Sequence, residues 1–130
     1  KIIERDLGQQ KRWWGLEQIS MNQRDMFLVP FPFSDQKGKK VRPVIVISND
    51  EFNRESEDVL IVSVTSNISK DKYTSPLSNN DLEEGQLDSQ CCIKVENILK
   101  IDKELVIKKI GRIRKEKLEK IIEILVKIVK

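Results

Sequence analysis

Short apolar runs rich in β-branched residues are the feature that most constrains how this chain can fold. Residues 44–47 (VIVI) are β-branched without interruption, and residues 59–65 (VLIVSVT) follow a similar pattern. Runs of this length and composition are typical of strands that are buried in a sheet. We therefore expect the core to be built mainly from β-structure.

Other patterns predict further strands and a single helix. Apolar residues recur at helical spacing over residues 115–129, with lysines and glutamates opposite, which predicts an amphipathic helix. Residues 34–40 and 49–58 are polar and are predicted as connections. Together the elements predict a mainly β fold, a small and strongly bent sheet or barrel with one C-terminal helix. The predicted strands are residues 25–33, 42–48, 59–65, 73–77, 90–96 and 106–110.

The composition is typical of one small soluble domain. The chain has 130 residues, of which 38% are hydrophobic and 35% charged, and its net charge is +3. This charge is compatible with an anionic partner but does not require one, because a lysine excess is common on solvated surfaces. No apolar run approaches the roughly 18 residues of a membrane span, so we expect no membrane contact.

The cysteine and histidine content narrows the possible chemistry. Cys91 and Cys92 are adjacent, and neighbours on a strand point to opposite faces, so they are poorly placed to form a disulfide or a metal clip. Free cysteines fit a reducing cytoplasm. The chain has no histidine, which removes the Ser-His-Asp and Cys-His nucleophile systems and the usual catalytic zinc sites. We expect neither a metal nor another cofactor.

Several motifs follow one another in an order that resembles the MazF/PemK family of toxin endoribonucleases from bacterial toxin–antitoxin pairs. The match is collinear over about residues 23–129. Each motif alone is weak, but their order and spacing together are specific. The motifs are RDMFLVPFPFSD (24–35), VRPVIVISND (41–50), VTS (64–66), IKVENI (93–98) and KKIGRI (108–113).

This resemblance implies a fold, an activity and partners. The fold would be similar to an SH3 barrel, and the protein would be a cytoplasmic homodimer neutralised by a cognate antitoxin protein. The activity would be sequence-specific cleavage of single-stranded RNA, without a ribosome and without a metal. The RNA 2′-hydroxyl would attack the adjacent phosphate and leave a 2′,3′-cyclic phosphate and a 5′-hydroxyl.

Arg42 and Thr65 are the strongest candidates for catalysis. From the residues alone, an arginine at the mouth of a buried strand either reaches toward water or is directed at something negative. The resemblance matches Arg42 to the family's catalytic arginine, whose guanidinium would stabilise charge on the phosphate oxygens. It matches Thr65 to the catalytic threonine, although threonine also simply suits a strand. Ser66, beside it, would bind RNA or merely begin a turn.

Lys94 and Glu96 are a second candidate pair. Two apart on a strand, they are expected to share one face. They fall where some relatives carry an Arg-x-Asp pair proposed as acid and base, which implies that Glu96 accepts the 2′-hydroxyl proton and Lys94 binds the phosphate. Lysine lacks the bidentate fork of arginine, and a solvated ion pair is the alternative interpretation.

The loop lysines Lys37, Lys39 and Lys40 lie where family members have a mobile loop near the RNA groove. Backbone phosphates would attract them without reading sequence, although they could equally serve solubility.

Residues 1–20 have no counterpart in the family pattern, and we place a domain boundary before Met21. The toxin-like domain is expected over residues 21–130. The first 20 residues are polar and carry Trp13 and Trp14 side by side. They are interpreted as an N-terminal extension, namely a leader, a segment introduced by cloning, or an antitoxin-like tail that docks on the body.

Two alternative functions remain at this point. Gyrase-inhibiting toxins share the fold and bind a protein without cutting RNA, and a catalytically weak nucleic-acid-binding relative would also fit. Arg42 together with Thr65 favours the nuclease, because a protein-binding surface does not need that pair.

Overall fold

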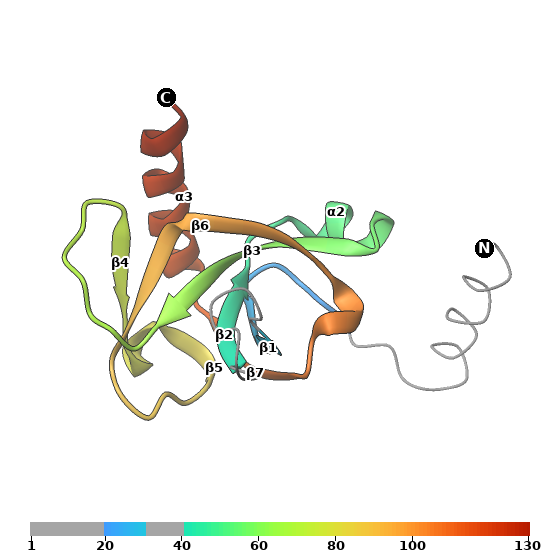
Figure 1. Cartoon of the computed structure of the whole chain (residues 1–130), viewed down its shortest axis with the longest axis horizontal. Helices are drawn as coiled ribbons and strands as arrows, with labels where there is room; N and C mark the ends of the chain where they lie inside the picture. The colour runs from blue at the N-terminus through green and yellow to red at the C-terminus, as the bar shows by residue number, and fades with distance from the viewer. Residues whose placement is uncertain (1–19, 31–40) are drawn as a thin grey trace, which may run out of the picture.

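The computed structural model describes residues 20–30 and 41–130. The chain forms seven strands and two α-helices over these residues, with two short 3₁₀ turns between them (Figure 1). The strands are β1 (Asp25–Pro30), β2 (Val41–Val46), β3 (Asp58–Thr65), β4 (Thr74–Leu77), β5 (Leu82–Gly85), β6 (Cys91–Asp102) and β7 (Lys108–Ile113). The helices are α2 (Asp50–Glu55) and α3 (Lys115–Val129), and the 3₁₀ turns are η2 (Asn79–Asp81) and η3 (Lys103–Leu105).

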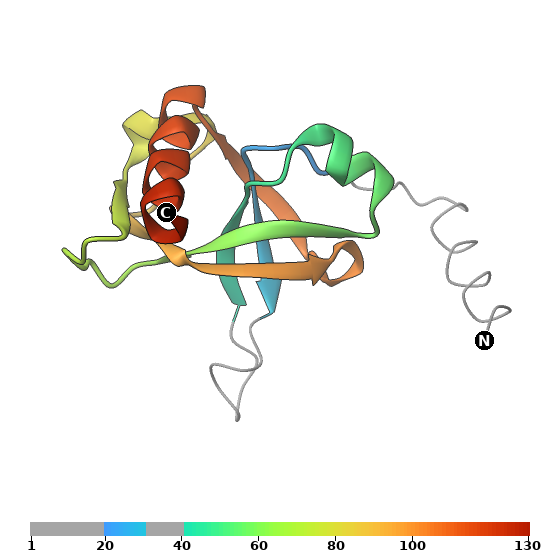
Figure 2. The same ribbon diagram turned by 90° about the horizontal axis from the view of Figure 1, so that it is seen from above.

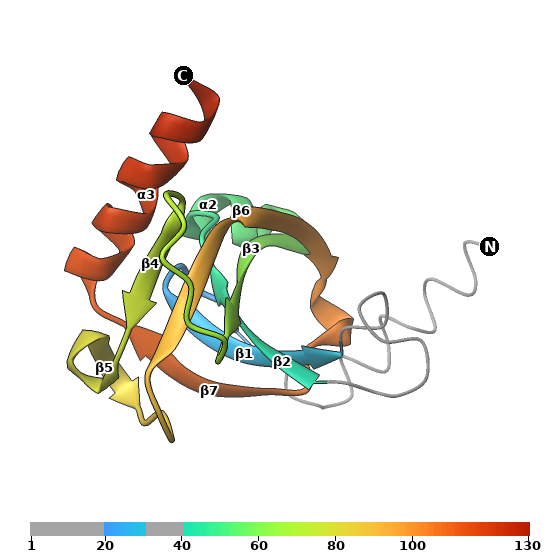
Figure 3. The ribbon, with the colours of Figure 1, turned by 60° about the vertical axis from the view of Figure 1, so that its left-hand side comes forward.

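All seven strands belong to one antiparallel sheet in the order β4-β6-β3-β2-β1-β7-β5. The sheet is strongly curled, so that β6 and β3 arch over β1 and β2 (Figure 3). Helix α3 lies outside the curl beside β4 and β6, as the view from above also shows (Figure 2). The predicted mainly β fold with one C-terminal helix is confirmed.

Each face of the sheet buries its own apolar cluster. Strand β3 shows the reason, because its side chains alternate between the faces: Val59 and Ile61 join one cluster, and Val62 and Val64 join the other. The outer cluster packs against Leu118 and Ile121 of α3. The cluster on the other face, called the inner cluster below, consists of Met21, Phe27, Val29, Val44, Val46, Val59 and Ile61.

Helix α3 spans residues 115–129, as its amphipathic pattern predicts. Leu118 and Ile121 are buried against the sheet. A second apolar row on the helix, Ile122, Val126 and Val129, stays exposed in the single chain. Among the described residues, no helix is both long and apolar enough to cross a membrane.

Three elements differ from what the sequence patterns predict. The polar connection 49–58 contains helix α2, whose first turn is capped by the side chain of Asn49, which accepts a hydrogen bond of 2.8 Å from the backbone N–H of Phe52. Residues 82–85 form strand β5, which is too short for a pattern. Strand β6 continues to Asp102, well past the predicted end at residue 96, because it bulges and then resumes its pairing with β3.

Both cysteines are free, as expected. Cys92 is buried, and Cys91 on the opposite face is partly buried. Burial raises the pKa of the Cys91 thiol, and the neighbouring Cys92 and Asp88 raise it further. A thiol with a raised pKa stays protonated at neutral pH and is a poor nucleophile.

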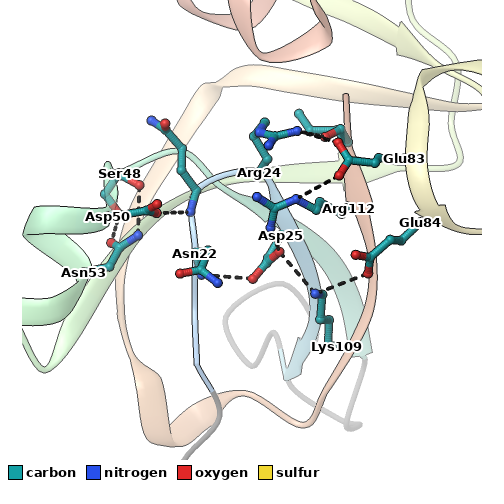
Figure 4. A network of polar contacts seen from close by, with 12 residues as sticks. Asn22, Arg24, Asp25, Ser48, Asp50, Asn53, Glu83, Glu84, Lys109 and Arg112 are labelled. Carbon is teal, nitrogen blue, oxygen red and sulfur yellow. Dashed lines mark hydrogen bonds and ion pairs between the residues drawn. The ribbon is translucent and has the colours of Figure 1, made fainter. Parts of the chain in front are cut away.

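An ion-pair network fastens β1, β7 and β5 together (Figure 4). The buried carboxylate of Asp25 contacts Arg112 Nη1 at 2.6 Å and Lys109 Nζ at 3.4 Å. Glu83 of β5 accepts a hydrogen bond of 2.8 Å from Arg24 and lies 3.6 Å from Nε of Arg112. This hydrogen bond and the charges of the arginines lower the pKa of Glu83, although partial burial opposes them. The network is structural, because the cations already engage carboxylates.

Candidate functional site

A hollow of about 360 Å³ opens where β2, β3 and β6 lie side by side. One lining residue comes from β2, three from β3, two from β6 and the rest from the segment that follows β3. The lining residues are Arg42, Ser63, Val64, Thr65, Asn67, Ile68, Ser69, Lys94 and Asn97. Three residues singled out in the sequence, Arg42, Thr65 and Lys94, are therefore brought together.

Strand register explains why these residues meet. Val44 of β2 lies opposite Ser63 of β3, and continuing this antiparallel pairing by two residues brings Arg42 level with Thr65. Ser63 in turn lies opposite Lys94 of β6. Residues directly opposite each other in a sheet point to the same face. The hollow is therefore the polar end of the inner face, whose other end is filled by the inner apolar cluster.

Arg42 is held by the strand that carries it. It lies opposite Val29 of β1, and Val29 and Val44 are both buried in the inner cluster. The side chain is partly buried, and its Nε is shielded from solvent while the residue lines the hollow. A guanidinium that is restrained in this way presents a fixed fork of donors, which suits the oxygens of a phosphate.

Thr65 ends β3, and its hydroxyl is oriented by the turn that follows. Its Oγ1 accepts a hydrogen bond of 3.1 Å from the backbone N–H of Asn67. Because this contact uses a lone pair of the oxygen, the hydroxyl proton remains available to donate. Thr65 is thereby prepared as a hydrogen-bond donor inside the hollow.

Lys94 adds a second cation to the hollow. Its Nζ lies 3.8 Å from Asp71 Oδ2, and the side chain of Asp71 is 62% exposed. An ion pair of this length at a solvated surface stabilises weakly, so it costs little for the ammonium to turn toward a phosphate. Among the described residues that line the hollow, two are cationic and none is a carboxylate. The hollow is therefore suited to an anion.

A bulge in β6 changes which side chains face the hollow. Val62 of β3 pairs with Ile98 of β6, but the next residue of β3, Ser63, pairs with Lys94. Residues 95–97 of β6 therefore have no pairing partner on β3. An odd insertion exchanges the two faces of a strand. Simple alternation from Lys94 predicts Glu96 on the same face, but Asn97 lines the hollow and the exposed Glu96 is not among the lining residues.

The other predicted site residues take different places. Ser66 is exposed next to Thr65 and is not among the lining residues. Lys37, Lys39 and Lys40 lie outside the described residues, as does the extension up to residue 19.

Sequence reasoning missed four polar residues of the hollow. Ser63, Asn67, Ser69 and Asn97 all line it. The alternation of Ser63 with Thr65 along β3 was a usable signal, because residues two apart on a strand share a face. No comparable signal marks Asn97, whose place depends on the bulge.

Comparison with known proteins identifies the family. The sequence pattern of the PemK-like, MazF-like toxins of type II toxin-antitoxin systems matches residues 22–129. Endoribonuclease EndoA of Bacillus subtilis (strain 168) is 34% identical over 98 residues, which cover 75% of this chain and 82% of that protein.

Solved structures share the fold at lower identity. A MazE–MazF crystal structure (form III) from Deinococcus radiodurans has a TM-score of 0.70 at 14% identity and covers 85% of this chain and 97% of that chain. A mycobacterial endoribonuclease in complex with its cognate antitoxin has a TM-score of 0.66 at 18% identity, covering 82% of this chain and 91% of that one. The family pattern and the EndoA match together confirm the resemblance drawn from the motifs: the chain belongs to the family of PemK-like, MazF-like toxins of type II toxin-antitoxin systems.

Proposed function

We propose that this protein is an endoribonuclease toxin that cuts single-stranded RNA in the hollow between β2, β3 and β6. The observation that carries the proposal is the convergence of Arg42, Thr65 and Lys94, which lie on three different strands and line one hollow. The toxin family and the endoribonuclease name of the B. subtilis relative support it.

The reaction proceeds by attack of a ribose 2′-hydroxyl on the adjacent phosphorus. A bond forms between O2′ and phosphorus while the bond from phosphorus to O5′ breaks. The 2′-hydroxyl loses its proton and O5′ gains one, so the products are a 2′,3′-cyclic phosphate and a 5′-hydroxyl. Negative charge builds up on the non-bridging oxygens, and stabilising that charge is the main task of the protein.

Three residues of the hollow have a defined part in this step. The guanidinium of Arg42 donates to the non-bridging oxygens, and its pKa above about 12 makes it a poor base. The hydroxyl of Thr65 donates a hydrogen bond to one of these oxygens. Its own oxygen already accepts the N–H of Asn67, so the hydroxyl proton is left to make this bond. Lys94 neutralises the phosphate as a point charge.

Glu96 remains a proposed base for the 2′-hydroxyl proton. It is exposed on the bulge next to the lining residue Asn97, so it would act from the rim of the hollow. Loss of activity in Glu96→Gln at the same RNA affinity would support this role. An unchanged rate would assign the proton transfer to another group.

The proposal extends to partners and location. A cognate antitoxin protein would neutralise the enzyme, as the complex of the mycobacterial relative suggests. The protein would act as a homodimer in the cytoplasm, where free cysteines such as Cys91 and Cys92 persist. The toxin domain would span residues 21–130, with residues 1–20 as an extension.

One assay separates this function from its alternatives. Long single-stranded RNA is incubated with the purified protein in EDTA, and the new ends are analysed chemically. We expect 2′,3′-cyclic phosphates and 5′-hydroxyls. Intact RNA would favour a toxin that binds a protein target such as gyrase, and cleavage that depends on a divalent metal would contradict the mechanism.

A further inference from the structure

The bulge in β6 gives the hollow a side chain that the catalytic scheme does not use. Asn97 is the last of the three bulged residues, and it lines the same hollow as Arg42 and Thr65. Bulges are found next to active sites because they redirect a side chain. Here the bulge presents an amide to the hollow in place of the acidic Glu96.

A hydrogen bond to Ser63 holds the side-chain amide of Asn97 in place. Its Nδ2 donates a hydrogen bond of 3.2 Å to Oγ of Ser63, which is only 5% exposed. The second N–H of this amide and its Oδ1 have no partner among the described residues. Asn97 therefore offers one donor and one acceptor, in one plane, to whatever enters the hollow.

A donor and an acceptor in one plane match the edge of a nucleobase. Contacts from Arg42 and Lys94 to phosphate position RNA but carry no sequence information, because every nucleotide has the same phosphate. Carboxamides read bases through paired hydrogen bonds, and proteins read single-stranded RNA on base edges that are free of pairing. Ile68, which is 56% exposed at the same hollow, offers an apolar surface to the face of a base.

We propose that Asn97 is a specificity-determining residue that reads the base of a nucleotide next to the scissile phosphate. Ser63 acts through it as a positioning residue. This inference rests on the proposed ribonuclease function and adds the part of the site that selects sequence. A strand carries Asn97, and a strand fixes a side chain more precisely than the loop that carries Asn67.

The test measures base preference rather than rate. RNA with a randomised segment is cut by the full chain, and the 5′-hydroxyl ends are sequenced to give the preference at each position around the cut. In Asn97→Ala, the preference at one position next to the cut should fall about tenfold, while the other positions keep theirs. Asn97→Asp keeps the shape but presents acceptors only, so it should change the preferred base at that same position.

Glu96→Gln is the matched control. Simple alternation along β6 would place Glu96 in the hollow, but Asn97 and not Glu96 is among the lining residues. This variant should leave the base preference unchanged, whatever it does to the rate. Melting temperatures are compared for all variants, and the isosteric Asn97→Asp decides the outcome if Asn97→Ala is unstable. Unchanged preference in Asn97→Asp, or an equal change in Glu96→Gln, would overturn the inference while cleavage itself stands. Absence of cleavage, or cleavage without any preference, by the unaltered protein would also overturn it.

Discussion

Thr65 shows how a single residue is prepared for chemistry by the backbone around it. Its oxygen accepts a hydrogen bond from the N–H of Asn67, and its hydroxyl proton can donate a hydrogen bond to a ligand. The valine variant Thr65→Val keeps the branched shape but loses this donor. A hydrogen bond to a charged group contributes about 1.5–3 kcal/mol, so single-turnover cleavage should fall roughly tenfold to hundredfold.

Thr65→Ser is the control for this prediction, because it restores the hydroxyl without the methyl group. It should retain most of the activity at the same RNA concentration. Equal rates for the valine variant and the unaltered protein would remove Thr65 from the mechanism.

The lowered pKa of Glu83 predicts that the stability of the folded protein depends on pH. Its pKa is lowered in the folded protein, first by the hydrogen bond from Arg24 and then by the neighbouring arginine charges. A carboxyl whose pKa is lowered by folding stabilises the protein above its unfolded pKa of about 4.3, and this contribution is lost as the pH falls through the folded pKa.

Thermal unfolding of Glu83→Gln against the unaltered protein measures this effect. The variant should melt lower at pH 6–7, and the two melting temperatures should converge below about pH 4. A difference that stays constant down to pH 3 would show that Glu83 acts by packing rather than by charge.

At the scale of elements, the contact between β5 and β7 depends on two glycines. Gly85 has a φ of +90°, and a Cβ there would lie 2.4 Å from the carbonyl oxygen of Ile110. Gly111, its pairing partner, leaves as little room, because its Cβ would lie 2.7 Å from the carbonyl oxygen of Glu84. The close approach of these backbones excludes a side chain.

Gly85→Ala should therefore lower the free energy of unfolding by roughly 1–3 kcal/mol, since it adds both a left-handed strain and a clash. Urea unfolding measures this change, and Gln86→Ala at the exposed neighbouring position is the control. A stability loss no larger than that of the control would mean that β5 shifts away without cost.

The sequence predicts the regular elements of this fold but not the bulge in β6. Periodicity located α3 and most strands, because residues 115–129 and the β-branched runs each obey one simple repeat. Motif matching then selected Arg42, Thr65 and Lys94, which all line the hollow. A bulge decides that Asn97 and not Glu96 lines the hollow. The bulge arises from the pairing of β6 with a strand that is distant in the sequence, so it leaves no local pattern.

At the scale of the whole molecule, the second apolar row of α3 supports the proposed homodimer. Ile122, Val126 and Val129 are spaced along one side of the helix and are exposed in the single chain, with Val129 at 74%. A two-fold partner would bury them. Val126→Asp should therefore convert dimer to monomer in sedimentation experiments, whereas Glu123→Gln on the same helix should not. A dimer of Val126→Asp that is as stable as the unaltered one would place the interface elsewhere.

If RNA is cut in the hollow around Arg42, cleavage depends first on the guanidinium of this residue. Single-turnover cleavage of an RNA in EDTA is measured for Arg42→Ala, with melting curves to establish that the variant folds. Losing one preorganised charge stabiliser should lower the rate by about two to three powers of ten. The cleavage rate of Arg42→Lys, which keeps the charge but not the fork of donors, should lie between the rates of Arg42→Ala and the unaltered protein. Cleavage by a folded Arg42→Ala variant at the unaltered rate would show that the hollow around Arg42 does not cut RNA.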